Sequence, residues 1–279
     1  MPFLRLLLGV CLLCSSVLRP ALAQAVRLAG VVQARGTGQP LPFVNIGIRG
    51  KNVGTVADAH GAFALQISAA YAHDTLTVSA IGYQEQGLPI AQLATSKNLL
   101  VQLIEKAAAL PEVVVRGRPQ KVRRLGTTSH NPLLWGNITS RETHDINEFV
   151  KLIALRDIPS QLVSAHIFLR RSTVDTVTFR LNFYSVARGL PGRRVVEQNI
   201  LVRSAIQNGW LTIDLSQYGL TLQQDFYLGF EFLPDDQGLE PAFSYGAQFG
   251  GAAVVRKSSL GAWKREPGAT LAAYVTVKQ

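Results

Sequence analysis

Short apolar segments interrupted by turn-forming residues are the feature that most constrains how this chain folds. Between residues 26 and 115, apolar and polar residues alternate over short runs, and glycine, proline, asparagine or aspartate breaks each run. In the run 43–49, Val44, Ile46 and Ile48 fall on one side of a strand. Because successive side chains of a strand point to opposite faces, this apolar side must face a core. The pattern predicts about seven short strands, and hence a small β-sandwich.

The same rhythm returns near residue 147 and continues to the end of the chain. It predicts eight or nine further strands, at Glu148–Leu155, Val163–Leu169, Thr176–Tyr184, Val195–Arg203, Trp210–Leu215, Phe226–Leu233, Phe243–Phe249, Ala252–Lys257 and Leu271–Val277. This number of strands indicates a jelly-roll or a related sandwich. The first of them has an alternative, a helix capped by Asp145 with Glu148 as its box partner, which Pro159 would soon end. The fold class expected is all-β, with two β-sandwich domains.

The first residues have the features of a secretory signal peptide, predicted to be cleaved after Ala23. Arg5 precedes an apolar run from Leu6 to Leu13, and small residues stand near the end of the segment. The apolar run is shorter than the roughly 20 residues that a spanning helix needs, so a retained anchor is the weaker alternative. Both cysteines lie in this segment, and acylation at Cys14 is disfavoured because the bulky Leu13 precedes it. The mature chain is therefore expected to be exported, to the periplasm, the outer membrane or the exterior, and to hold no disulfide or cysteine-bound zinc.

Positive charge is concentrated between the two predicted domains. The chain carries a formal charge of +10, and the segment Arg116–Arg124 contains five cations and no acid. No aromatic residue lies among these cations, so a solvated linker is favoured over a nucleic-acid-binding face. The predicted organisation is a signal peptide (1–23), a first sandwich (24–115), a basic linker with an irregular segment (116–145) and a second sandwich (146–279).

The first predicted sandwich resembles a known family. The matching residues, in order, are Gly30, Gly38, Pro40, Leu41, Val44, Gly54, Thr55, Asp58, Gly61, Phe63, Asp74, Leu76, Val78, Gly82 and Tyr83. This series is similar to the carboxypeptidase-like regulatory domain, which implies a transthyretin-like β-sandwich. The family also occurs in front of SusC-type TonB-dependent transporters, where a segment similar to 110–115 commonly follows it. The part of the chain that remains is too short for a transporter barrel, so transport is not carried over.

The second predicted sandwich also resembles a β-domain that often stands behind the first in secreted envelope proteins. The residues that carry this likeness are Phe179, Phe183, Tyr184, Pro191, Gly192, Trp210, Asp214, Leu215, Tyr218, Phe226, Tyr227, Gly229 and Glu231. The resemblance implies a fold and no particular activity.

No motif with catalytic spacing stands out in the sequence. The five histidines are scattered, and none has a glutamate three residues later, as a zinc carboxypeptidase site would need. Gly-x-Ser-x-Gly, phosphate-loop and dinucleotide-binding patterns are absent from the sequence. The one acidic cluster is Glu142, Asp145 and Glu148, and its offsets of three and six do not place the carboxylates together on one strand face. We therefore expect no catalytic residue, metal or cofactor, and keep a glycan hydrolase using this cluster as an alternative.

Glycan binding is the sharper alternative to catalysis, because sugar sites commonly stack aromatic rings on the ligand. Trp263 follows a glycine-containing segment typical of a hairpin tip, and Tyr245 lies on a predicted strand, so these two are the candidate ligand-binding residues. Trp210 heads an alternating strand and is expected to pack at the core or its edge. The function predicted is a non-catalytic envelope protein that binds a glycan or a partner protein, possible partners being an outer-membrane protein but not nucleic acid. A structural or adhesive component is the third alternative.

Overall fold

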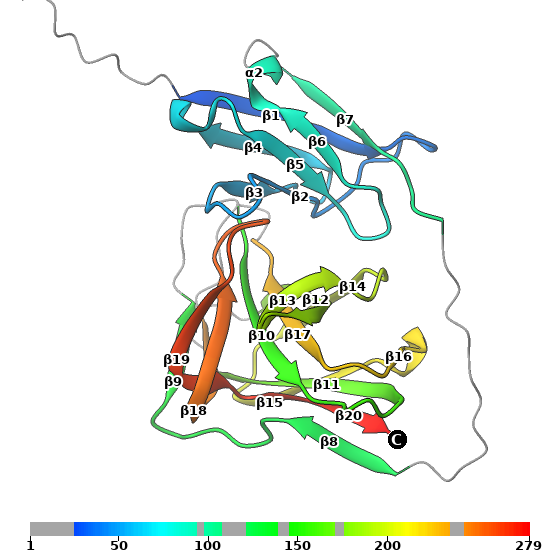
Figure 1. Ribbon diagram of the computed structural model, residues 1–279, viewed down its shortest axis with the longest axis vertical. Helices are drawn as coiled ribbons and strands as arrows, with labels where there is room; N and C mark the ends of the chain where they lie inside the picture. The colour runs from blue at the N-terminus through cyan, green and yellow to red at the C-terminus, as the bar shows by residue number, and fades with distance from the viewer. Residues whose placement is uncertain (1–24, 94–97, 108–120, 139–144, 171–175, 235–242) are drawn as a thin grey trace, which may run out of the picture.

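The structure is a computed structural model that describes residues 25–93, 98–107, 121–138, 145–170, 176–234 and 243–279. Figure 1 shows two β-domains, with the N-terminal domain above the C-terminal one. The prediction of an all-β chain with two sandwich domains is confirmed. Within the described ranges, no helix has the length and apolar character to cross a membrane. The predicted signal peptide lies outside the described residues.

The N-terminal domain packs a three-stranded sheet, β4-β1-β7, against a four-stranded sheet, β3-β2-β5-β6. A single apolar cluster fills the space between the two sheets. All strand pairs are antiparallel except β1 with β7, which is parallel. The elements are β1 (Val26–Ala34), β2 (Asn45–Gly47), β3 (Gly54–Val56), β4 (Ala62–Ile67), the 3-10 helix η1 (Ala69–Tyr71), β5 (Thr75–Ser79), β6 (Gln86–Pro89), the short helix α2 (Ile90–Leu93) and β7 (Leu99–Leu103).

One face of the strand around β2 is buried as the sequence predicts, but the opposite face is buried as well. Val44, Ile46 and Ile48 are buried in the core of the N-terminal domain. However, Asn45 is also buried, with 1% of its surface exposed. Burial of both faces of one strand in a two-layer domain requires a second covering body. That body is the C-terminal domain, whose side chains contact Asn45.

The C-terminal domain folds two layers around a larger apolar core. One layer has the order β13-β12-β17-β10, and the other has the order β11-β20-β8, with β15 and β16 also paired to β11. The long strand β18 pairs with β10 near its end and with β11 near its start, so it belongs to both layers. The elements are β8 (Val122–Gly126), β9 (Trp135–Ile138), β10 (Asn147–Ile153), β11 (Ser160–Arg170), β12 (Thr176–Ala187), β13 (Leu190–Arg194), β14 (Ile200–Ala205), β15 (Gly209–Asp214), the 3-10 helix η2 (Ser216–Tyr218), β16 (Thr221–Leu222), β17 (Phe226–Phe232), β18 (Phe243–Arg256), β19 (Lys264–Leu271) and β20 (Ala273–Lys278).

Several local predictions need correction. The segment 116–145, expected as a solvated linker and irregular chain, contributes β8 and β9 to the C-terminal sheet. Only Leu125 of β8 packs on the core, so the strand has almost no apolar signal and depends on pairing with β20. The two strands predicted at 243–257 are one strand with a bulge near Phe249, and β19 was not predicted. Residues 195–199 lie between β13 and β14, whereas the sequence placed them in a strand.

The junction between the domains depends on close approach of backbone to backbone. A Cβ atom added to Gly47 would lie 2.5 Å from the carbonyl oxygen of Ser259, and one added to Gly54 would lie 2.8 Å from the same atom. The amide of Gly50 also donates a 2.9 Å hydrogen bond to the carbonyl of Leu260. The β2–β3 hairpin therefore lies directly on the 258–260 loop, as Figure 1 shows for these regions.

We predict that Gly47→Ala weakens the junction. The new methyl group has no room beside the Ser259 carbonyl, and overpacking of this kind costs about 1–3 kcal/mol. Gly36→Ala is the matched control, since a Cβ there meets nothing within 4 Å. Denaturant unfolding of the full chain should show a loss of stability for Gly47→Ala and none for the control. Equal stability of the two variants would mean that this approach does not hold the domains together.

Candidate functional site

Four charged residues form a row across neighbouring strands at the top of the C-terminal domain. Arg180 on β12 pairs with Glu231 on β17, Glu231 pairs with Glu148 on β10, and Glu148 pairs with Arg256 on β18. Their register places all four side chains on one sheet face, opposite the apolar core. None has more than 7% of its surface exposed. We call these four residues the charge row.

The charge row is held together by short contacts. Arg256 contacts Oε2 of Glu148 through Nη2 at 2.6 Å and Nε at 2.7 Å. Arg180 Nε lies 3.0 Å from Oε2 of Glu231. Between the two carboxylates, Asn182 Nδ2 donates to Glu148 at 2.9 Å and to Glu231 at 2.7 Å. Both amide hydrogens are thereby used, and among the described residues Oδ1 of Asn182 has no donor.

The two glutamates of the charge row differ in acidity. Burial raises the pKa of Glu148, and the neighbouring Glu231 charge raises it further, against the opposing effect of Arg256. Burial would also raise the pKa of Glu231, but the charges of Arg180 and Arg256 outweigh it and bring that pKa below its usual value. Glu231 is therefore the stronger acid of the two, because the guanidinium groups of Arg180, Arg256 and Arg194 all favour its ionised form.

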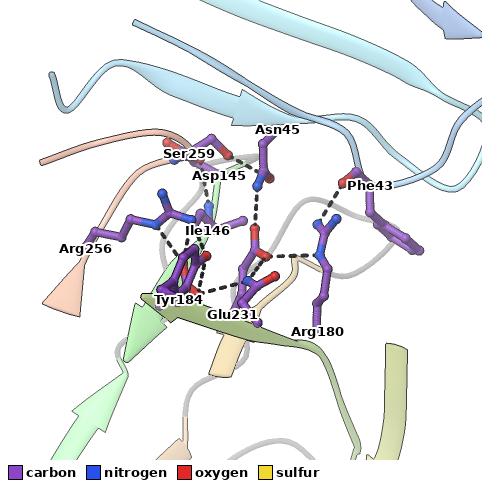
Figure 2. A network of polar contacts seen from close by, with 11 residues as sticks. Phe43, Asn45, Asp145, Ile146, Arg180, Tyr184, Glu231, Arg256 and Ser259 are labelled. Carbon is purple, nitrogen blue, oxygen red and sulfur yellow. Dashed lines mark hydrogen bonds and ion pairs between the residues drawn. The ribbon is translucent and has the colours of Figure 1, made fainter. Parts of the chain in front are cut away.

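The N-terminal domain covers the charge row and forms hydrogen bonds with it. Asn45 Nδ2 on β2 donates a 2.9 Å hydrogen bond to Oε1 of Glu231, and Arg180 Nη2 donates a 2.7 Å hydrogen bond to the carbonyl of Phe43. Figure 2 shows both bonds running from the charge row up to the N-terminal domain. Phe43 has a φ of 54°, the left-handed region, which a non-glycine residue rarely adopts. The junction thus adds one hydrogen-bond partner from the N-terminal domain to each member of the Arg180–Glu231 ion pair.

The predicted acidic cluster does not form an open site. Asp145 accepts hydrogen bonds from the Ser258 hydroxyl at 2.6 Å and from the amide of Ser259 at 2.7 Å, and burial raises its pKa. Glu148 lies in the charge row and has 0% of its surface exposed. Glu142 lies outside the described residues. The segment predicted as a strand at 148–155 is a strand over Asn147–Ile153 and not the alternative helix, so Asp145 does not cap a helix.

A second feature, which the sequence analysis did not predict, lies on the outer face of the layer that contains β11, β15 and β20. On β11, Ile167 and Leu169 point into the core, so His166 and Phe168 point outward. Trp210 on β15 is the cross-strand partner of Phe168, and Tyr274 on β20 is that of His166. Aromatic side chains at the outward positions of three predicted strands were the signal that could have found it.

The outward rings form one continuous series of contacts. Ring centroids are 5.3 Å apart for Phe168 and Trp210, 5.0 Å for Trp210 and Tyr274, and 4.1 Å for Tyr274 and His166. At the other end, His130 stacks on Phe168 at 3.7 Å, and Trp135 lies 5.8 Å from Phe168. We call these six rings the aromatic face. Figure 1 places β11, β15, β20 and β8 on the side of the C-terminal domain away from the N-terminal domain.

Three hydroxyl groups surround the His166 ring within the aromatic face. Its Nδ1 lies 3.0 Å from Oγ1 of Thr212, and its Nε2 lies 2.8 Å from Oγ of Ser164 and 3.0 Å from Oγ1 of Thr276. Burial, and then the charge of Arg124, lowers the pKa of His166 from 6.5 to about 4. No group of three histidine, cysteine, aspartate or glutamate side chains in the described part of the chain is placed to hold a metal ion.

The two predicted ligand-binding residues already have partners within the protein. Trp263 is half-buried, packs edge-to-face on Tyr184 at 5.6 Å and lies under the Arg256 guanidinium at 4.7 Å. Tyr245 packs against the core, 4.5 Å from the ring of Phe149. Its ring also covers Gly136, where a Cβ would lie 2.1 Å from it. The structure therefore does not bring Trp263 and Tyr245 together. Trp210, expected at the core or its edge, belongs to the aromatic face.

Comparison with known proteins identifies the first of the two domains. Residues 28–115 match the family model described as "CarboxypepD_reg-like domain". The N-terminal domain is a CarboxypepD_reg-like domain. This confirms the resemblance seen in the sequence, and it means that a CarboxypepD_reg-like domain covers the charge row. The match ends before β8, so it leaves the C-terminal domain unassigned.

One curated relative and one solved structure give further comparisons. The TonB-dependent receptor SusC of Bacteroides thetaiotaomicron is 38% identical over 100 residues, which are 36% of this chain and 9% of the receptor. The chain therefore spans only a small part of that relative. A structure titled "Structure of infectious bursal disease virus Gt strain" aligns over 90% of this chain and 62% of its own, with 10% identity and a TM-score of 0.25, too low to bear on the fold. The jelly-roll assignment of the C-terminal domain stays a prediction.

We predict that Arg256→Met strongly destabilises the protein. The substitution leaves Glu148 buried without its cationic partner, and breaking a buried ion pair on one side costs about 3–5 kcal/mol. Arg265→Met, at an exposed arginine of β19, is the control. Chemical denaturation should separate the two variants by several kcal/mol. A loss for Arg256→Met no greater than for the control would contradict the account of the charge row.

We also predict a pH dependence from His166. Because its pKa is lower in the folded state, the unfolded chain takes up a proton between pH 6.5 and about 4 that the folded chain does not. The His166 contribution to stability is therefore present above pH 6.5 and is lost as the pH falls toward 4. His166→Gln should flatten the stability profile in this window relative to wild type, and His60→Gln, at an exposed turn, should not. Superimposable profiles for wild type and His166→Gln would contradict the assignment.

Proposed function

We propose that this chain is a non-catalytic protein of the bacterial cell envelope that binds a glycan through the aromatic face of its C-terminal domain. The CarboxypepD_reg-like domain is fixed to the opposite side by the charge row and serves as a docking unit for a partner at the outer membrane. The observation that carries the proposal is the aromatic face itself.

Six interlocked rings on the outer side of a sheet need an explanation other than core packing. The core of this domain lies on the other side of the same strands, where a separate apolar cluster fills it. Trp210, Phe168 and Trp135 remain partly exposed. Partly exposed rings that are held rigidly by their neighbours lose little side-chain entropy when a ligand stacks on them. Stacking on a sugar ring is the use that best fits rings with hydroxyl groups close by.

The proposal of a non-catalytic role is supported by what the acidic residues do. A glycoside hydrolase needs two carboxyl groups flanking its substrate. Glu148 and Glu231 are instead saturated by Arg256, Arg180 and Asn182 and lie under the N-terminal domain. No substrate reaches them in this arrangement.

The proposal of an envelope location is supported by two observations. The first residues have the composition of an export signal, and the N-terminal domain is similar to part of a relative named as a TonB-dependent receptor. A role in glycan uptake follows from this similarity as a proposal for the present chain.

A glycan array tests the binding function directly. Wild-type protein should bind a subset of oligosaccharides, and Trp210→Ala should lose that binding, because it removes the ring that contacts both Phe168 and Tyr274. Trp263→Ala is the control, since Trp263 packs on Tyr184 and Arg256, away from the aromatic face. Circular dichroism should show both variants folded. Binding that survives Trp210→Ala and is lost in Trp263→Ala would move the site to Trp263.

A further inference from the structure

The aromatic face carries a positive charge that its packing does not neutralise. The guanidinium of Arg170 lies 5.1 Å from the ring of Trp135, and that of Arg124 lies 5.8 Å from the ring of Tyr274. Both arginines are exposed, and among the described residues neither forms an ion pair with a carboxylate. The remaining charged groups on the outward positions of these strands are Lys278 on β20 and Asp214 on β15.

The positions of the two arginines are as informative as their charge. In the series of ring contacts, Arg170 stands at the Trp135 end and Arg124 stands at the Tyr274 end. His130, Phe168 and Trp210 connect these ends. The cations are therefore separated by a row of stacking surfaces, whereas a compact cluster would suit a single polyvalent anion.

We propose that the aromatic face binds a glycan whose sugar rings carry carboxylates, that is, a uronate-containing chain. This inference rests on the proposed glycan-binding function and names the chemical class of the glycan. The partly exposed rings of Trp135, Phe168 and Trp210 stack on sugar faces, and Arg124 and Arg170 each pair with a carboxylate of a different sugar residue.

Charge complementarity supports a uronate chain over a nucleic acid. The described outward positions hold three cations and one acid, Arg124, Arg170 and Lys278 against Asp214. A nucleic acid carries a phosphate at every nucleotide and is bound through many cations. A uronate chain carries one carboxylate on each charged sugar, and one cation can pair with each carboxylate. Two arginines at opposite ends of the ring series match this spacing of charge. The guanidinium fork also pairs with a carboxylate through two parallel hydrogen bonds.

The geometry of the arginines explains how they serve this role. Each is positioned by its contact with an aromatic ring, so its guanidinium is held near the surface on which a sugar would stack. The low pKa of His166, which burial and the Arg124 charge cause, keeps the imidazole neutral, so the arginines supply the charge of the face at neutral pH.

Isothermal titration of the full chain with oligogalacturonate, at low salt, is the test. Wild-type protein should bind it, and a neutral oligogalactoside of the same length should bind at least about tenfold more weakly, a difference of about 1.4 kcal/mol. Arg124→Gln and Arg170→Gln should each weaken uronate binding by about tenfold and leave binding of the neutral sugar unchanged. Raising the salt concentration should weaken uronate binding only.

Arg203→Gln is the matched control, because Arg203 is an exposed arginine on β14, in the other layer. The Arg203→Gln variant should bind oligogalacturonate as wild type does. If it loses as much affinity as Arg124→Gln and Arg170→Gln do, binding depends on the overall positive charge of the protein, and the inference is overturned. Equal binding of the neutral sugar overturns the uronate inference and leaves glycan binding intact. Binding of neither sugar, together with a blank glycan array, overturns both proposals. Tighter binding of single-stranded DNA or of a sulfated oligosaccharide overturns the choice of uronate.

Discussion

The structure depends on the cost of keeping charges away from water. Glu148, Glu231, Arg180 and Arg256 sit side by side at the top of a β-sheet, where the N-terminal domain excludes solvent. A buried ion pair contributes little net stability compared with apolar residues of the same shape, but it is costly to break on one side. Such a row therefore adds specificity: only a domain that offers an amide at Asn45 and a carbonyl at Phe43 completes the hydrogen bonding of Glu231 and Arg180. This explains how two sandwiches in one chain come to have one defined arrangement.

Charged groups have different surroundings on the two opposite sides of the C-terminal domain. The junction side uses its polar groups internally, and Gly229 leaves space for the Glu148 side chain, since a Cβ there would lie 2.5 Å from Oε1. The far side carries rings and cations that have no acidic partner among the described residues. The side turned toward the N-terminal domain thus has its charges paired within the protein, whereas the far side carries exposed cations beside partly exposed rings. Under the proposed function, the glycan-binding surface lies on the side of the C-terminal domain away from the CarboxypepD_reg-like domain.

Strand alternation allowed much of the fold to be predicted from the sequence. The strand at 62–67 and the buried set Val44, Ile46 and Ile48 follow from a period of two and from flanking turn residues. The outward residue Asn45 could not be predicted as buried, because its cover comes from Glu231, 186 positions away. The strand β8 was also not predicted, because its basic residues are typical of a linker. Only its pairing with β20 makes the segment a strand. The site was harder still to predict. The aromatic face joins rings from β9, β11, β15 and β20 with His130 from the segment before β9, and only the topology makes these segments adjacent.

A double-mutant cycle between Asn45→Ala and Glu231→Ala tests the central claim most directly, because each substitution removes one partner of the hydrogen bond between the domains. If the N-terminal domain completes the charge row through this contact, the two substitutions should be coupled by about 0.5–3 kcal/mol in the free energy of unfolding. Additive effects, within about 0.5 kcal/mol, would contradict the account, because they would show that the domains do not share this network.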